Sequence, residues 1–285
     1  MSHPTRQHVV GWAWASLVAN VVIVFTGGLV RLTSSGLGCP TWPRCTASSF
    51  VPHRALGIHG VIEFSNRMLT YALVAVAVGT LLAVWRCAET RRERSLAVLL
   101  AAGIPLQGVI GGITVLTDLN PWLVSLHLVT SMVLVAGSVI LMSRVAQWRT
   151  ADAGRPALGI VRALAVVAAV VVYLGTMVTG SGPHAGDASS PRNGLDSMSL
   201  SEWHGGAVAA LVMLTLAAVV LLKGTPAARW AWALLAVELV QAAIGVAQYE
   251  LGLPIWLVAA HLVGAAILVA VTTALVTGTS RQGTI

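Results

Sequence analysis

Charged residues are scarce in this sequence. Asp, Glu, Lys and Arg make up 9% of the 285 residues, whereas hydrophobic residues make up 56% and the mean hydropathy is +0.83. Soluble domains carry about 25% charged residues, so the composition excludes a soluble globular fold. Because most of the chain is apolar, no large soluble domain fits beside the apolar part.

Long apolar runs occupy the chain instead. A helix needs about 20 apolar residues to cross the hydrocarbon core of a membrane, and eight runs reach that length. Lipid admits only helices and closed barrels, and runs this long indicate helices. We therefore predict an all-α integral membrane protein with eight transmembrane helices. The predicted helices span residues 10–30, 56–85, 95–116, 122–143, 160–180, 202–222, 228–249 and 254–277.

The basic residues lie mainly in alternate loops. The net charge of +7 is typical of nucleic-acid binding, but twelve Lys and Arg fall in one set of loops and four in the other. That asymmetry indicates membrane topology and places both termini in the cytoplasm. We expect no nucleic-acid partner, contact with membrane lipid, and a multi-pass location in the cytoplasmic membrane of a bacterium. The first apolar run ends without a cleavage pattern, so we expect a retained helix.

A stretch of the sequence occurs twice. Residues 107–136 and 241–270 align without a gap and share Gln, Ile, Gly, Leu, Trp-Leu-Val, His-Leu-Val and Leu-Val-Ala. In both copies a histidine, His127 or His261, lies twenty residues after a glutamine. Similar apolar helices arise by chance, but a shared register of His, Gln and Trp does not. We predict an internal repeat in which residues 1–150 and 151–285 form two pseudo-symmetric four-helix bundles.

The second predicted helix opens with a polar stripe. His59, Glu63 and Asn66 share one helical face, with Arg67 beside it. Polar groups inside a membrane are costly unless they face protein or water, so the stripe indicates a functional site. The alternative is an interfacial helix end whose side chains reach the lipid headgroups, with Arg67 snorkelling. A second intramembrane acid, Glu238, is interpreted as a hydrogen-bonded structural carboxylate.

Each half places histidine near the outer ends of its helices. His204 and His261 lie at comparable depth in the second half, and His127 lies at the matching depth in the first. A single membrane histidine is commonly a proton relay or a packed core residue. Two at one level suit an iron porphyrin held between helices, whereas zinc would lack ligands and copper a nearby Met or Cys cluster. Only the first half adds a carboxylate, Glu63, placed for proton transfer or charge stabilisation.

The first outer loop holds two cysteines. Cys39 and Cys45 lie in a stretch rich in Gly, Pro, Ser and Thr, on the side where the environment is oxidising. A disulfide that closes this short loop is one interpretation, and two free thiols are another. A zinc site would have only His53 as a further ligand nearby, and is less favoured.

Several of these features together resemble the haem A synthase family of the CtaA type. They are the segments RLTSSGLGCPTWPRC and IEFSNR, the two His-Leu repeats and the eight helices, and the resemblance covers nearly the whole chain. It implies an oxidoreductase that converts the position-8 methyl group of haem O to a formyl group. The product, haem A, serves terminal oxidases. It also implies haem O synthase and oxidase assembly factors as partners, and leaves a homo-oligomer open.

The resemblance also assigns roles to residues. It implies a resident haem b whose iron is bound by His204 and His261, and a substrate haem O bound by His127, both near the outer face. The family glutamate corresponds to Glu63, and the family cysteine pair to Cys39 and Cys45. The methyl group would be hydroxylated twice, and the resulting diol would lose water.

One position departs from the family pattern. The family motif is Glu-x-x-His-Arg, and Asn66 stands where its histidine is expected. Either His127 alone binds the substrate haem, or His59 has a role near it; we favour a role for His59 without direct ligation. The rival function is a dihaem b-type subunit that exchanges electrons with quinone, and a repeat-built transporter is a further alternative.

Overall fold

The computed structural model describes residues 6–87 and 90–280. Eight of its helices are long and apolar enough to cross a membrane, which confirms the predicted number and class of helix. Their bounds are α1 Arg6–Leu32, α2 Gly57–Cys87, α3 Arg91–Leu116, α4 Pro121–Val145, α5 Gly154–Ser181, α6 Ser197–Leu221, α7 Ala228–Glu250 and α8 Ile255–Gly278. A short 3-10 helix, η1 (Arg54–Leu56), precedes α2.

Local capping explains where several helices begin. Thr90 and Glu93 form a reciprocal capping box, so α3 begins at Arg91, four residues before the predicted start. Asn120 caps α4 ahead of Pro121, and the carboxylate of Asp196 accepts a hydrogen bond from the backbone of Ser199 at the start of α6. The caps satisfy backbone N–H groups that the first turn leaves without a partner.

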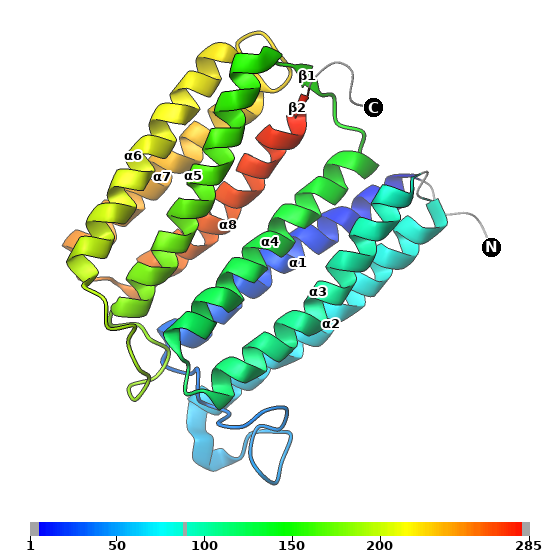
Figure 1. Cartoon of the computed structure of the whole chain (residues 1–285). Helices are drawn as coiled ribbons and strands as arrows, with labels where there is room; N and C mark the ends of the chain where they lie inside the picture. Colours follow the sequence, from blue (N-terminus) through cyan, green and yellow to red (C-terminus); the bar gives the residue numbers. More distant parts are fainter. Residues whose placement is uncertain (1–5, 88–89, 281–285) are drawn as a thin grey trace.

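The helices are arranged in two groups of four (Figure 1). Within each group, the contacts between helices close into a ring. In the first helix group, α1 to α4, each helix contacts the next and α4 returns to α1; in the second helix group, α5 to α8, α8 returns to α5. Thus α2 lies diagonally across from α4, and α6 lies diagonally across from α8. Between the groups, α8 contacts both α1 and α4, and α4 contacts α5.

Each helix group has its own apolar core. Leu100, Leu141 and Met142 belong to the core of the first group, and Leu164, Leu234 and Leu275 to that of the second. A third cluster, with Val24, Met132 and Ala266, fills the contact between the groups.

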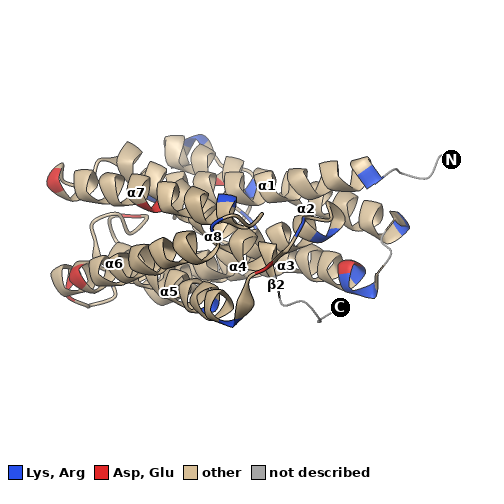
Figure 2. Cartoon of the chain, turned by 90° about the horizontal axis from the view of Figure 1, so that it is seen from above, with Lys and Arg blue, Asp and Glu red and all other residues tan. Residues whose placement is uncertain are grey.

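The outward surface is also apolar. Exposed residues include Trp14, Leu99, Val133, Val220 and Leu239, and Figure 2 shows that most of the ribbon carries no charge. An apolar surface on this scale fits lipid rather than water.

The two ends of the molecule differ in structure. At one end, β1 (Ala151–Asp152) pairs in parallel with β2 (Thr279–Ser280) and joins the α4–α5 connection to the end of α8. At the opposite end, the loop between α1 and α2 extends beyond the helices (Figure 1). Arg31 of α1 donates to the carbonyl oxygens of Thr179 and His184, and so links the two helix groups there.

Candidate haem sites and the carboxylate beside one of them

Three histidines pack against glycines of the preceding helix. A Cβ atom on Gly111 of α3 would lie 3.2 Å from Cε1 of His127, and one on Gly175 of α5 would lie 3.3 Å from Cε1 of His204. For Gly245 of α7 and His261 the distance is 3.6 Å. Each imidazole therefore lies directly on a helix backbone, and the absence of a side chain on the glycine gives the ring its space.

The histidines lie on diagonal helices of their groups. His204 is on α6 and His261 on α8, and the two rings are close enough to interact electrostatically. His127 is on α4, and the helix diagonal to it is α2, which carries Glu63 and Asn66. Each repeat histidine therefore lies on the helix diagonal to the one that carries His204 or Glu63 and Asn66.

Each histidine has a ring nitrogen that the protein does not satisfy. Within the described parts of the chain, the buried Nδ1 atoms of His127, His204 and His261 have no hydrogen-bond partner. A buried polar atom without a partner costs about 1–3 kcal/mol, and only a group that bonds to that nitrogen would relieve the cost.

The donor set fits a porphyrin better than a bare ion. Among residues 6–87 and 90–280, no three His, Cys, Asp or Glu side chains are grouped to hold a metal ion. A porphyrin supplies four equatorial nitrogens of its own and needs only axial ligands, for which neutral imidazole is a usual choice. The interior between helices is apolar, as a flat apolar macrocycle requires.

The glutamine and the histidine of each repeat copy lie twenty residues apart, and in the first copy the structure shows a contact that explains this spacing. Nε2 of Gln107 donates to the backbone oxygen of His127 at 3.0 Å and to Oγ of Ser131 at 2.5 Å. In the second copy, a Cβ on Gly264 would overlap the side chain of Gln241, so that glutamine packs on the helix of His261. Both glutamines therefore join the two helices of their repeat.

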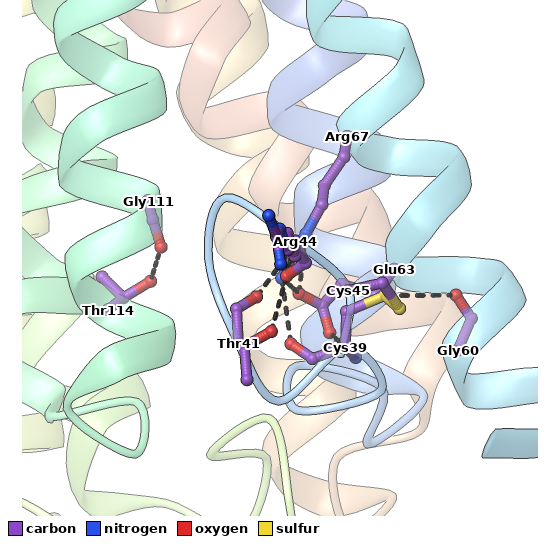
Figure 3. Close-up of polar contacts among 9 residues, drawn as sticks. All are labelled: Cys39, Thr41, Arg44, Cys45, Gly60, Glu63, Arg67, Gly111 and Thr114. Atoms are coloured by element: carbon purple, nitrogen blue, oxygen red, sulfur yellow. Dashed lines mark hydrogen bonds and ion pairs between the residues drawn. A yellow bond between two sulfur atoms is a disulfide. The ribbon is translucent and has the colours of Figure 1, made fainter. Parts of the chain in front are cut away.

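Glu63 is buried and fully engaged at both oxygens (Figure 3). Oε1 accepts hydrogen bonds from Nη2 of Arg67 at 2.5 Å and from Nε at 3.1 Å, and Oε2 accepts one from the backbone N–H of Cys39 at 2.5 Å. The remaining hydrogen bonds of Arg67 go to the carbonyl oxygens of Cys39, Thr41 and Arg44. The carboxyl group of Glu63 is thus fixed between α2 and the loop that joins α1 to α2.

A disulfide closes that loop. Cys39 and Cys45 are bonded and buried, which confirms the disulfide interpretation. The loop between them also reaches α3, because a Cβ atom on Gly112 would overlap the ring of Trp42. The disulfide loop therefore lies over α2 and α3 of the first helix group, beside Glu63.

His59 lies apart from the Glu63–Arg67 pair. Its side chain is exposed, and Nδ1 lies 3.0 Å from Oγ of Ser35. It lines a cavity of about 420 Å³ together with Asp187 of the loop that joins α5 to α6. Hydrogen bonds from Ser189 hold the pKa of Asp187 below its usual value, and His59 acts in the same direction. The structure thus places an ionised carboxylate beside His59.

Asn66 follows Glu63 by three residues on α2. Its Oδ1 accepts a hydrogen bond from Oγ1 of Thr26 at 2.8 Å, and its Nδ2 lies 4.0 Å from the Cβ position of Gly27.

Glu238 lies on α7, in the second helix group. Oγ1 of Thr215 donates to the buried Oε1 of Glu238 at 2.7 Å. One oxygen of Glu238 thus has a hydrogen bond, whereas its buried Oε2 has no partner among the described residues, and a structural role for Glu238 stays a prediction.

Sequence reasoning missed Thr26 and the glycines that face the histidines. Gly111 and Gly245 carried a signal, because each follows the glutamine of its repeat by four residues. Gly175, Gly27 and Thr26 lie in apolar helices outside the aligned copies, where nothing in the sequence distinguishes them.

A family model described as cytochrome oxidase assembly protein, COX15-CtaA, matches residues 10–273. The chain belongs to this family. The resemblance to the haem A synthases is thereby confirmed at the level of the family.

Curated relatives carry the name haem A synthase. The protein of Listeria welshimeri is 27% identical over 175 residues, which are 59% of this chain and 57% of the relative. The protein of Halalkalibacterium halodurans is 30% identical over 128 residues, 44% of this chain and 42% of the relative. The match thus spans about half the length of these relatives. The eight helices of membrane-spanning length fit a multi-pass membrane protein of this family.

Proposed function

We propose that the chain is a haem A synthase that oxidises the position-8 methyl group of haem O to a formyl group. The observation that carries the proposal is the asymmetry between the helix groups. Both groups offer glycine-backed imidazoles with an unsatisfied Nδ1. Among the described residues, the first group adds a buried carboxyl group, Glu63, that is tied to an arginine and to the disulfide loop, whereas the buried Glu238 of the second group bonds only to Thr215.

The second helix group is the site of the resident cofactor in this proposal. His204 and His261 would hold haem b by its iron. When bound, haem b would supply one-electron transfer. The protein's part is to hold both imidazoles in place, through Gly175 and Gly245, and to keep water away with its apolar core.

The first helix group is the site of the substrate. His127 would bind the iron of haem O, and Glu63 would lie near the reacting methyl group. Conversion of a methyl to a formyl group adds one oxygen atom at the level of water and releases four protons and four electrons, and the electrons must pass to an external acceptor. Glu63 is placed to accept such protons or to stabilise positive charge on the methyl carbon, because Arg67 and Cys39 fix its orientation.

The proposal includes the membrane arrangement. Residues 1–150 and 151–285 would be pseudo-symmetric halves, with both termini in the cytoplasm and both haem sites near the outer face of the cytoplasmic membrane. Distinct apolar cores in α1–α4 and α5–α8 support the two halves, and the alternating basic loops support the orientation.

Pigment extraction tests the function. The full chain should be produced with a haem O synthase and its haems separated by chromatography. We expect haem b and haem A in the purified protein, and accumulation of haem A in the membranes. Two tightly bound haem b groups, with haem O never converted, would instead identify a dihaem electron-transfer subunit.

A further inference from the structure

Asn66 in the first helix group and His204 in the second lie on corresponding helices, α2 and α6. Each residue is on the helix diagonal to a repeat histidine, His127 or His261. Each also faces a glycine of the preceding helix, which for Asn66 is Gly27 of α1. The fold therefore presents an amide where the other group presents an imidazole.

The hydrogen bonding of Asn66 leaves its amide N–H groups available. Thr26 donates to the carbonyl oxygen Oδ1 at 2.8 Å, so the oxygen already has a partner. Within the described residues, Nδ2 donates to no protein acceptor, and it faces Gly27, which has no side chain to fill the space. The half-buried side chain is therefore oriented with its donor end free.

We propose that Asn66 is a positioning residue for the face of the substrate haem opposite His127. This inference rests on the proposed function. Asn66 does not bind the iron: it leaves that coordination position open, and its N–H donates a hydrogen bond to a small ligand, such as water, bound there. Thr26 sets the orientation of the amide.

The chemistry of the side chain supports this role. Haem iron takes His, Cys, Met or Tyr side chains as axial ligands, and a neutral amide is not among them. Hydrogen-bond donors beside an open position determine which small molecules bind there. A haem with one protein ligand also has one fewer bond to break, which suits a substrate that must enter and leave.

The position of Glu63 agrees with the same arrangement. Residues three apart on a helix lie on one face, so Glu63 and Asn66 border the same side of the site. Arg67 and Cys39 already satisfy the carboxylate. In this arrangement Glu63 is held by Arg67 and Cys39 beside the site, while Asn66 supplies the hydrogen-bond donor.

Carbon monoxide tests whether the position is open. The purified, haem-loaded chain is reduced and titrated with carbon monoxide, and spin state is followed by absorption and electron paramagnetic resonance. We expect the substrate haem to bind the gas and the haem at His204 and His261 not to bind it. Asn66→His should supply a sixth ligand, convert the substrate haem to low spin and weaken carbon monoxide binding at least about tenfold.

Fluoride tests the hydrogen bond, because bound fluoride accepts one. Asn66→Leu should keep the position open but weaken fluoride binding to the oxidised substrate haem by about three- to tenfold, the effect of one hydrogen bond. Thr26→Val, which leaves Asn66 in place but removes its partner, should weaken fluoride binding by a smaller factor. Unchanged fluoride affinity in both variants would overturn the role of the amide.

The His59 alternative has a separate outcome. If the wild-type substrate haem is low spin and inert to carbon monoxide, and His59→Ala makes it reactive, His59 is the second ligand and the proposal is wrong. All these readouts are independent of turnover. A protein that fails to make haem A yet binds carbon monoxide opposite His127 would contradict the proposed function and leave this inference standing.

Discussion

Arg67 and Glu63 lie one turn apart on α2, and their ion pair holds the loop between α1 and α2 to the helix. Nη2 of Arg67 is 2.5 Å from Oε1 of Glu63, while the same guanidinium donates to three carbonyl oxygens of the loop that Cys39 and Cys45 close. The orientation of the proposed catalytic carboxylate therefore depends on the guanidinium and on the loop (Figure 3).

Removal of the charge on Glu63 should stop turnover without loss of haem. Glu63→Gln keeps the size of the side chain but cannot accept a proton or stabilise positive charge, so we expect haem A formation to fall at least about a hundredfold, within the range for a lost acid–base group. Haem A formation and total haem are measured in the same preparation. Glu202→Gln, an exposed acid near the start of α6, is the control and should be fully active. Full activity in Glu63→Gln would contradict the proposed role of Glu63 in proton transfer or charge stabilisation.

Loss of the guanidinium should destabilise the protein. Arg67→Met leaves Glu63 charged and buried with one partner fewer, and breaking a buried pair in this way costs about 3–5 kcal/mol. Arg67→Lys keeps the charge but cannot reach the carboxylate and three carbonyl groups together, so it should be intermediate. Thermal unfolding in detergent measures the effect, with Arg54→Met, an exposed residue, as control. Equal unfolding temperatures for all variants would show that the pair is not needed for stability.

The cysteine pair should act through the same carboxylate. Cys39→Ser with Cys45→Ser frees the loop whose backbone N–H bonds Oε2 of Glu63, so we expect activity to fall while haem b stays bound. Haem A formation and the low-spin spectrum are compared before and after the change. Normal activity in the double variant would make the disulfide merely structural.

The two second-group histidines should be required for resident haem. His204→Ala or His261→Ala removes an axial ligand, so each variant should lose the tightly held haem b. The low-spin absorption spectrum of the purified protein measures this, and His53→Ala, an exposed residue of the first outer loop, is the control. An unchanged low-spin spectrum in either histidine variant would contradict the assignment.

The sequence predicted the parts of the fold that depend on apolar length. Eight apolar runs indicated eight helices, which the structure contains. The observed helix ends differ from the predicted ends: α3, for example, begins at Arg91, because the capping box of Thr90 and Glu93 extends the helix beyond its apolar run. The cysteine pairing was predicted as one of several alternatives, and the structure selects it. Contacts between distant helices were not predictable, because Thr26 and Gly27 acquire a role only once α1 packs against α2.

The glycine opposite each histidine gives the sharpest test of the haem sites. Gly111→Val would place a branched side chain where even a Cβ lies 3.2 Å from the ring of His127, so the imidazole must move. Gly108→Val, on the same helix, is a matched control, because nothing lies within 4 Å of its Cβ position. Both changes have the same cost in helix propensity, so their difference isolates the contact with the ring. We expect Gly111→Val to lose the substrate haem and to keep haem b, while Gly108→Val retains both, as measured by extraction and spectroscopy. Equal substrate-haem content in the two variants would contradict the proposal that His127, packed against Gly111, binds that haem.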